Sequence, residues 1–133
     1  AETQDQPDLL QNAFQADYGW HFKDMLYLMG GGAGTKTDFA TELVRMQSSY
    51  TGGSYPMLFI TNHDENSWNG TEYERLGADV KVMTVLYFTL PGIPLVYNGQ
   101  EVSFNRALQF FVLFVTFCNM FFHSAWPVDW GRA

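Results

Sequence analysis

The residues with the clearest chemical potential are Asn62, His63 and Asp64, which directly follow an apolar run at residues 57–60. A short apolar run bounded by polar residues is typical of a strand buried on both faces. Such strands form parallel sheets covered by helices, and these sheets carry active sites where their strands end. The trio could equally be a turn, because Asn and Asp side chains often cap backbone groups. Spacing alone leaves both interpretations open.

The sequence around this trio favours catalysis. The run Phe59-Ile60-Thr61-Asn62-His63-Asp64 resembles the F-x-x-N-H-D element that ends the seventh barrel strand in the α-amylase superfamily of glycoside hydrolases. Residues 90–101, LPGIPLVYNGQE, resemble the eighth strand of that family and the loop after it. The resemblance implies an α/β fold, namely a partial (β/α)8 TIM barrel that is incomplete and holds about strands five or six to eight.

The same resemblance implies roles for individual residues. Breaking a glycosidic bond requires an acid that protonates the leaving oxygen and carboxylates that meet the positive charge developing on the sugar. Asp64 would stabilise the transition state, His63 would bind sugar hydroxyls, and Asn62 would orient the loop. Glu2, in the order AE…AFQADYGW, resembles the general acid at the end of the fifth strand. The alternative for Glu2 is a frayed terminal carboxylate.

Two aromatic residues are candidate substrate contacts. Trp68 follows the trio, and Tyr97 stands at the mouth of the next expected strand. Either ring could offer its face to a sugar. Packing in the core or at its rim is the simpler explanation for each residue taken singly.

One part of the family's catalytic set has no counterpart in this sequence. The family's nucleophile is an Asp within a G-F-R-x-D-like motif on the fourth strand, and the 133 residues contain no such motif. The double displacement of a retaining enzyme needs that group. We therefore expect a fragment of a retaining glycoside hydrolase for α-glucan or maltooligosaccharide substrates, inactive alone. The alternative is a non-catalytic α-amylase-like protein used for binding or assembly, with a membrane-contacting tail, but the intact trio favours hydrolase ancestry.

Composition narrows the possible partners. The net charge is −7 and the seven Lys and Arg residues are scattered, which argues against nucleic acid as a partner. Cys118 is the only cysteine, so no internal disulfide forms, and no Cys/His spacing indicates a metal. We assign no cofactor or metal. Calcium is common in the family, but its usual ligands lie largely outside this segment. The resemblance is compatible with a secreted or periplasmic parent.

Periodicity predicts the elements that position these residues. We expect a short strand at residues 12–17, then a helix with a stripe of Phe22, Met25, Leu26 and Met29 that leaves Lys23 outside it. A second helix, with Thr37 as N-cap, should pack a face containing Met46 while Glu42 points elsewhere. A polar loop at 65–71, a helix at 73–90 and a strand at 93–97 should follow. With the first four strands absent, we expect an open sheet edge and an exposed apolar face.

The end of the chain does not resemble the family. Residues 107–128 contain no Asp, Glu, Lys or Arg and approach the length that spans a bilayer. Gln109, Asn119 and His123 interrupt this run. We therefore divide the chain into the barrel half at residues 1–106 and an anomalous apolar tail at residues 107–133, which we interpret as inserted or erroneous sequence. Membrane contact through residues 107–126 is the alternative that we do not favour.

Overall fold

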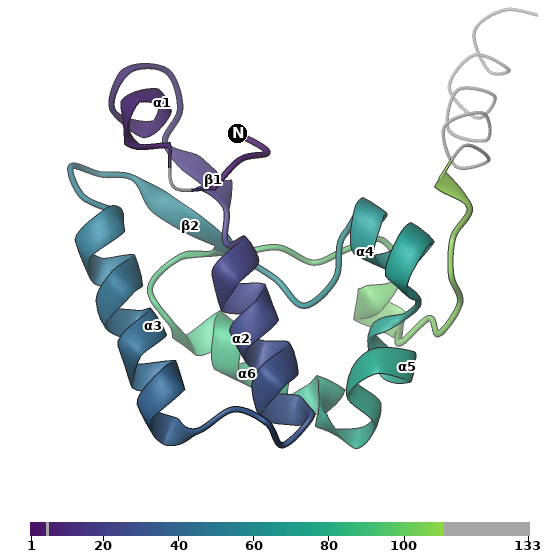
Figure 1. Ribbon diagram of the computed structural model, residues 1–133. Helices are drawn as coiled ribbons and strands as arrows, with labels where there is room; N and C mark the ends of the chain where they lie inside the picture. Colours follow the sequence, from purple (N-terminus) through teal and green to yellow (C-terminus); the bar gives the residue numbers. More distant parts are fainter. Residues whose placement is uncertain (5, 111–133) are drawn as a thin grey trace, which may run out of the picture.

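Short parallel strands and the helices between them make up the part of the chain that the computed structural model describes, residues 1–4 and 6–110 (Figure 1). The strands are β1 (Ala16–Tyr18), β2 (Tyr55–Leu58) and β3 (Ile93–Pro94). The α-helices are α1 (Pro7–Asn12), α2 (Trp20–Gly30), α3 (Lys36–Ser49), α4 (His63–Asn69), α5 (Glu72–Leu76) and α6 (Val80–Thr89). Two 3-10 turns complete the order, η1 (Gly77–Asp79) and η2 (Gln100–Val102).

The sheet has the order β1-β2-β3, and both neighbouring pairs are parallel. Tyr18 is paired with Met57, and Met57 in turn with Ile93. Residues 1–3 run beside β1 on its other side, because the N-terminal amine donates to Ala16 O at 2.6 Å and Tyr18 N donates to Thr3 O at 3.2 Å. Four adjacent segments thus point the same way. The described residues form an α/β unit compatible with part of an α-amylase barrel.

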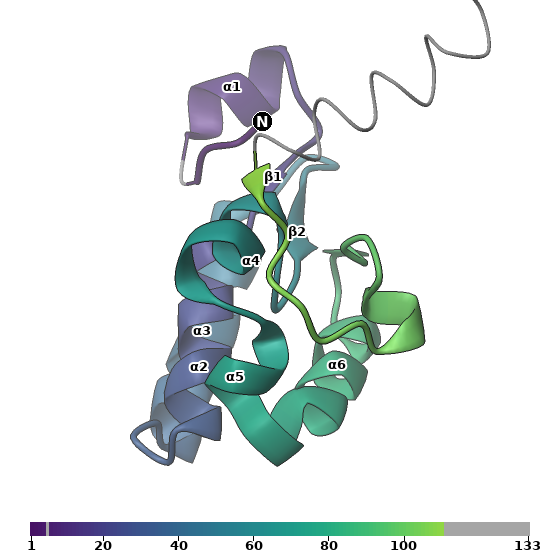
Figure 2. The same cartoon turned by 90° about the vertical axis from the view of Figure 1, so that its right-hand side faces the viewer.

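The core lies between β2 and the helices that connect the strands. Figures 1 and 2 show α2, α3 and α6 extending below the strands. Leu58 and Ile60 from β2 and its end pack with side chains from these helices, and the main buried helix residues are Phe22, Leu26, Leu76, Val80, Met83 and Tyr87. Burial of this apolar surface is the main stabilising contribution to the unit. It also fixes the end of β2, where the candidate site begins.

Several predicted elements are present with different bounds. Residues 12–17 are not one strand, because Pro7 opens helix α1, a position that suits proline, and the strand starts only at Ala16. The helix expected at 73–90 is divided at Gly77, whose φ of 56° lies in the left-handed region. The last strand covers two residues rather than residues 93–97, and Pro94 cannot donate to a ladder.

Helix capping explains two further corrections. The N-cap of α3 is Thr35, not Thr37, because Thr35 and Asp38 form a reciprocal capping box. The expected polar loop at 65–71 is mostly helix α4, since Asn62 caps it and two acidic residues occupy its first turn.

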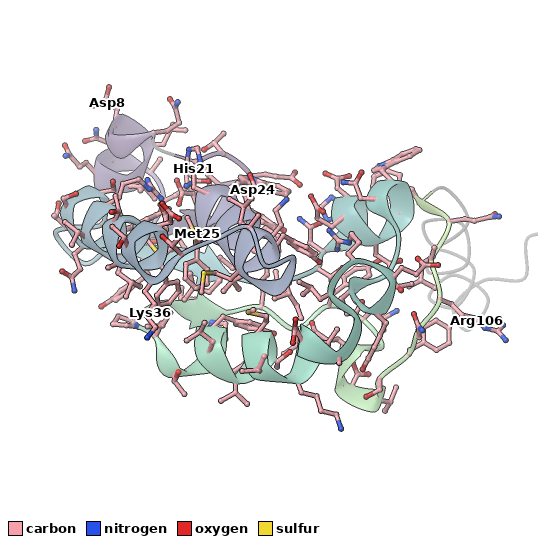
Figure 3. All side chains as sticks on the ribbon, turned by 60° about the horizontal axis from the view of Figure 1, so that its bottom comes forward. Asp8, His21, Asp24, Met25, Lys36 and Arg106 are labelled. Carbon is pink, nitrogen blue, oxygen red and sulfur yellow. The ribbon has the colours of Figure 1, made fainter. Side chains whose placement is uncertain are left out.

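Two charged residues expected outside the packed stripes are buried. Lys23 is 9% exposed and Glu42 is 7% exposed. Each has an ion-pair partner: Lys23 Nζ lies 2.9 Å from a Glu65 oxygen, and Glu42 binds Arg45 at 2.8 Å. Charges are buried only when paired in this way. By contrast, Asp8 and Lys36 on their helices and Arg106 on the segment after η2 point outward (Figure 3).

The side of the molecule formed by α6 and β3 carries exposed apolar residues. Val82, Val85, Phe88, Ile93 and Val96 are among them. β3 pairs with a single strand among those described, so the expected open edge is present. No helix within residues 1–4 and 6–110 has the length and hydropathy needed to cross a membrane. The predictions for the apolar tail fall on residues 111–133, apart from its first four residues, and so lie outside the described residues.

Candidate active site

Asn62 sets the local geometry at the end of β2. Its backbone is extended, and its side-chain Oδ1 accepts a hydrogen bond from Glu65 N at 2.8 Å. This bond makes Asn62 the N-cap of α4, and its side chain is only 1% exposed. His63 and Asp64 therefore occupy the first turn of α4, at the carboxyl end of a parallel strand. The interpretation of the trio as a turn and its interpretation as a functional site are therefore compatible. Asn62 caps the helix, while the side chains of His63 and Asp64 stay accessible to solvent.

Glu2 joins these residues from the segment on the far side of β1. His63 Nε2 lies 3.2 Å from Glu2 Oε1 and 3.8 Å from Asp64 Oδ1. One ligand atom from each of the three side chains lies within 4.8 Å of the other two. All three side chains are partly exposed to solvent. The structure thus brings together Glu2, His63 and Asp64, with Asn62 buried behind them; their catalytic and binding roles remain predictions.

Tyr18 borders the same cluster and was not predicted. Burial raises the pKa of its phenol, and the negative charges of Glu2 and Asp64 raise it further. Its ring stacks on Trp20 with centroids 5.4 Å apart, and both rings meet Phe59 edge-on. Its place at the end of β1, the strand beside β2, is the signal that could have identified it. Tyr18, Trp20 and Phe59 thus form an aromatic cluster, of which Tyr18 interacts with the two carboxylates.

The two predicted aromatic contacts have different surroundings. Trp68 is 63% exposed, and its ring lies 5.9 Å from the ring of Phe110. Phe110 in turn lies 5.7 Å from the ring of His63, which links Trp68 to the cluster. Tyr97 belongs to a separate group, because its backbone N–H donates to Gln100, which donates to the hydroxyl of Tyr87. Burial raises the pKa of Tyr97.

Phe110 reaches His63 because residues 105–110 are bound to α4. Asn66 makes two of these hydrogen bonds, donating to Arg106 O at 3.3 Å and accepting from Leu108 N at 2.7 Å. Ser67 Oγ donates to Leu108 O at 2.8 Å. Nothing in the sequence pattern indicated these contacts, since they join residues some forty positions apart.

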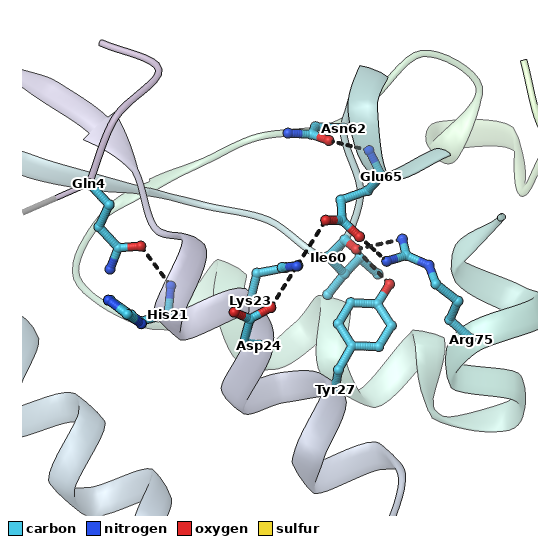
Figure 4. A network of polar contacts seen from close by, with 9 residues as sticks. All are labelled: Gln4, His21, Lys23, Asp24, Tyr27, Ile60, Asn62, Glu65 and Arg75. Carbon is cyan, nitrogen blue, oxygen red and sulfur yellow. Dashed lines mark hydrogen bonds and ion pairs between the residues drawn. The ribbon is translucent and has the colours of Figure 1, made fainter. Parts of the chain in front are cut away.

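An ionic network surrounds Glu65, the residue that follows Asp64 in α4 (Figure 4). Lys23 from α2 binds one oxygen of Glu65 at 2.9 Å, and Arg75 from α5 binds the other oxygen. The carbonyl oxygen of Ile60 accepts from Tyr27 Oη at 2.7 Å and from Arg75 Nη2 at 3.3 Å. Burial raises the pKa of Glu65, but the hydrogen bonds and charges of its two cationic partners outweigh burial and lower it overall.

The cluster also has the donor types of a metal site. Two carboxylates and an imidazole are ligands that a divalent cation such as Zn²⁺ accepts. Exposed acidic groups commonly lie this close without a metal, and we assign none. Two hollows in the described part of the chain, of about 530 and 270 Å³, lie near α3 and are lined by none of the three cluster residues.

Comparison with solved structures finds α-amylases whose fold is similar to that of this chain. An α-amylase from Lactobacillus plantarum matches with a TM-score of 0.66 and 26% identity, covering 80% of this chain and 25% of that enzyme. A noncanonic maltogenic α-amylase, AmyB from Thermotoga neapolitana, matches with the same TM-score and identity, covering 81% and 25%. No protein-family model and no curated protein matches the chain significantly. The chain spans about a quarter of the length of these enzymes. In its sequence motif and in its fold, this chain is α-amylase-like, with a structure similar to about a quarter of these enzymes.

Proposed function

We propose that this chain is the C-terminal part of the catalytic barrel of a retaining glycoside hydrolase acting on α-glucosidic bonds of starch-type oligosaccharides. The observation that carries the proposal is the convergence of Glu2, His63 and Asp64, which come from two parallel segments on either side of β1. The structural likeness to α-amylases supports a glycoside hydrolase-like fragment and a carbohydrate substrate in general terms. The bond type and the starch-type substrate are our own extension.

The cluster suits the chemistry of glycoside hydrolysis. In this proposal Glu2 is the acid that protonates the leaving oxygen, and Asp64 stabilises the positive charge that develops on the sugar. Oxygens of the two groups lie within 4.8 Å of each other, so both can face the same glycosidic bond. His63, 3.2 Å from Glu2, is placed both to orient the acid and to donate to a sugar hydroxyl.

Aromatic surface beside the cluster supports a sugar ligand. The exposed ring of Trp68 offers an apolar face, and sugar rings present apolar C–H surfaces that pack against such faces. Phe110 extends this surface toward His63. A ligand held there would lie next to the two carboxylates. The second solved relative is described as maltogenic, which makes a maltooligosaccharide the first ligand to test.

We propose that the chain alone does not turn over substrate, because the sequence lacks the family's nucleophile motif. Removing a catalytic carboxylate typically costs several orders of magnitude in rate. The direct test is incubation of the purified chain with maltoheptaose and measurement of released reducing ends. Cleavage at a rate abolished by Asp64→Asn would overturn the proposal of inactivity while supporting the role of Asp64.

Sugar binding tests the site without requiring turnover. Isothermal titration of maltoheptaose into the chain should show weak binding that falls in Asp64→Asn. The matched control is Asp8→Asn, which removes an exposed carboxylate on α1 and should leave binding unchanged. Equal binding by all three proteins would refute the assignment of Asp64, and absence of binding to the unmodified chain would refute the proposed site.

A further inference from the structure

The ionic network around Glu65 takes no part in the proposed chemistry. Glu65 is 6% exposed, and each of its carboxylate oxygens is bound by a cation from a different helix, Lys23 from α2 and Arg75 from α5. Asp24 adds a second, more exposed acidic partner at 2.6 Å from Lys23 Nζ. Buried Lys23, partly buried Arg75 and the carboxylate between them therefore tie α2 and α5 to the first turn of α4 (Figure 4).

The same network holds the chain just before the site. The carbonyl oxygen of Ile60 lies beyond the β-ladder and accepts hydrogen bonds from Tyr27 and Arg75. Arg75 thus binds the backbone on one side of His63 and Asp64, and binds the side chain of Glu65 on the other side. The backbone N–H of Glu65 also donates to Asn62. The two residues proposed to meet the sugar lie between two fixed points.

Stability alone gives a poor reason for such a network. Removing charges from water costs several kcal/mol per ion, and buried ion pairs can often be replaced by apolar side chains with no loss of stability. What an apolar cluster cannot supply is direction, since a bidentate guanidinium fixes both the distance and the plane of its partners. Glu65 and Ile60 O each receive a directed bond from the same Arg75 side chain.

We propose that the Lys23–Glu65–Arg75 network is a positioning device that fixes the turn carrying His63 and Asp64 for substrate binding. In this role Glu65 and Arg75 are positioning residues, because they act through the turn and do not touch the sugar. That the positioning serves sugar binding rests on the proposed function, but the fixing of the turn itself can be measured without any sugar.

The experiment compares the unmodified chain with the triple variant Lys23→Met/Glu65→Met/Arg75→Met. The apolar replacement removes all three charges together and leaves only Asp24, whose side chain is 61% exposed to water, without its cationic partner. The melting temperature should therefore stay close to that of the unmodified chain. Amide hydrogen exchange at residues 61–65 should become about tenfold faster, and affinity for maltoheptaose should fall about tenfold. A merely structural network would change neither quantity in a variant of equal stability.

A second ion pair with a buried carboxylate provides the matched control. Glu42 and Arg45 on α3 form a bidentate pair away from the cluster. The variant Glu42→Met/Arg45→Met should leave exchange at residues 61–65 and sugar affinity unchanged. Should the triple variant fail to fold, Arg75→Lys carries the test, since it keeps the charge but lacks the planar fork whose two nitrogens bind Glu65 and Ile60 O. Faster exchange at residues 61–65 in this variant would support the proposal.

The outcomes separate the two proposals. Unchanged exchange at residues 61–65 in a folded triple variant, or in Arg75→Lys when the triple variant does not fold, overturns the positioning role whatever happens to sugar binding. Faster exchange with unchanged affinity overturns the claim that positioning serves the sugar. If the unmodified chain shows no affinity for maltoheptaose, the proposed function fails, and the exchange rates alone then decide whether the network fixes the turn.

Discussion

Replacing Asn66 by alanine should release residues 105–110 from α4. The Asn66 side chain makes two hydrogen bonds to this segment, one to Arg106 O and one from Leu108 N. Each hydrogen bond contributes about 1 kcal/mol net, and both freed backbone groups can reach water once the segment opens. The loss is therefore about 2 kcal/mol, which raises the open population of the segment about thirtyfold.

The effect should be local, because residues 105–110 lie outside the core cluster. Amide exchange at Leu108, measured by NMR, should accelerate about thirtyfold, while the main unfolding transition changes little. Ser67→Ala is the control: it removes one bond to the same segment but keeps Leu108 N bound to Asn66, so the acceleration should be only several-fold. Equal exchange at Leu108 in both variants would refute the reasoning that Asn66 holds the segment against the site.

Three further predictions concern packing and charge. Gly92→Ala should lower the free energy of unfolding by about 1–3 kcal/mol, because a methyl there would lie 2.9 Å from a β2 carbonyl oxygen. In urea unfolding the midpoint should fall while the slope stays the same, and an unchanged midpoint would contradict this packing. Glu2→Gln should lower the raised pKa of Tyr18, which burial and the charges of Glu2 and Asp64 produce, and a phenol titration by carbon NMR that shows no change would place Glu2 elsewhere. Folding lowers the pKa of Glu65, so ionised Glu65 stabilises the fold above its unfolded pKa, and this contribution is lost as the pH falls through its folded pKa. Glu65→Gln lacks the titrating group, so urea unfolding should show that this variant loses less stability on acidification than the unmodified chain.

The sequence by itself predicted the buried run before the trio, although strand β2 covers Tyr55–Leu58 and ends before Phe59. The apolar run at residues 57–60 predicted a buried segment, and the structure confirms that Phe59 and Ile60 are fully buried. The resemblance carried by the Asn62-His63-Asp64 trio is confirmed by the likeness to α-amylases. These features are local, since an apolar run and a capping residue act over a few neighbouring positions. Helix α2 was predictable for the same reason, because Phe22 and Leu26 repeat with the helical period.

Tertiary structure decided which distant residues complete the site. Lys23 and Glu65 looked like solvent-facing charges in the sequence, and only their distance of 2.9 Å in the fold explains why both are buried. The sequence did not indicate that Phe110 lies beside His63, because this contact depends on the hydrogen bonds between α4 and the segment before Phe110. Glu2 meets Asp64 only because residues 1–3 lie beside β1. Such contacts join residues far apart in the chain, and no local periodicity encodes them because they depend on how whole elements pack.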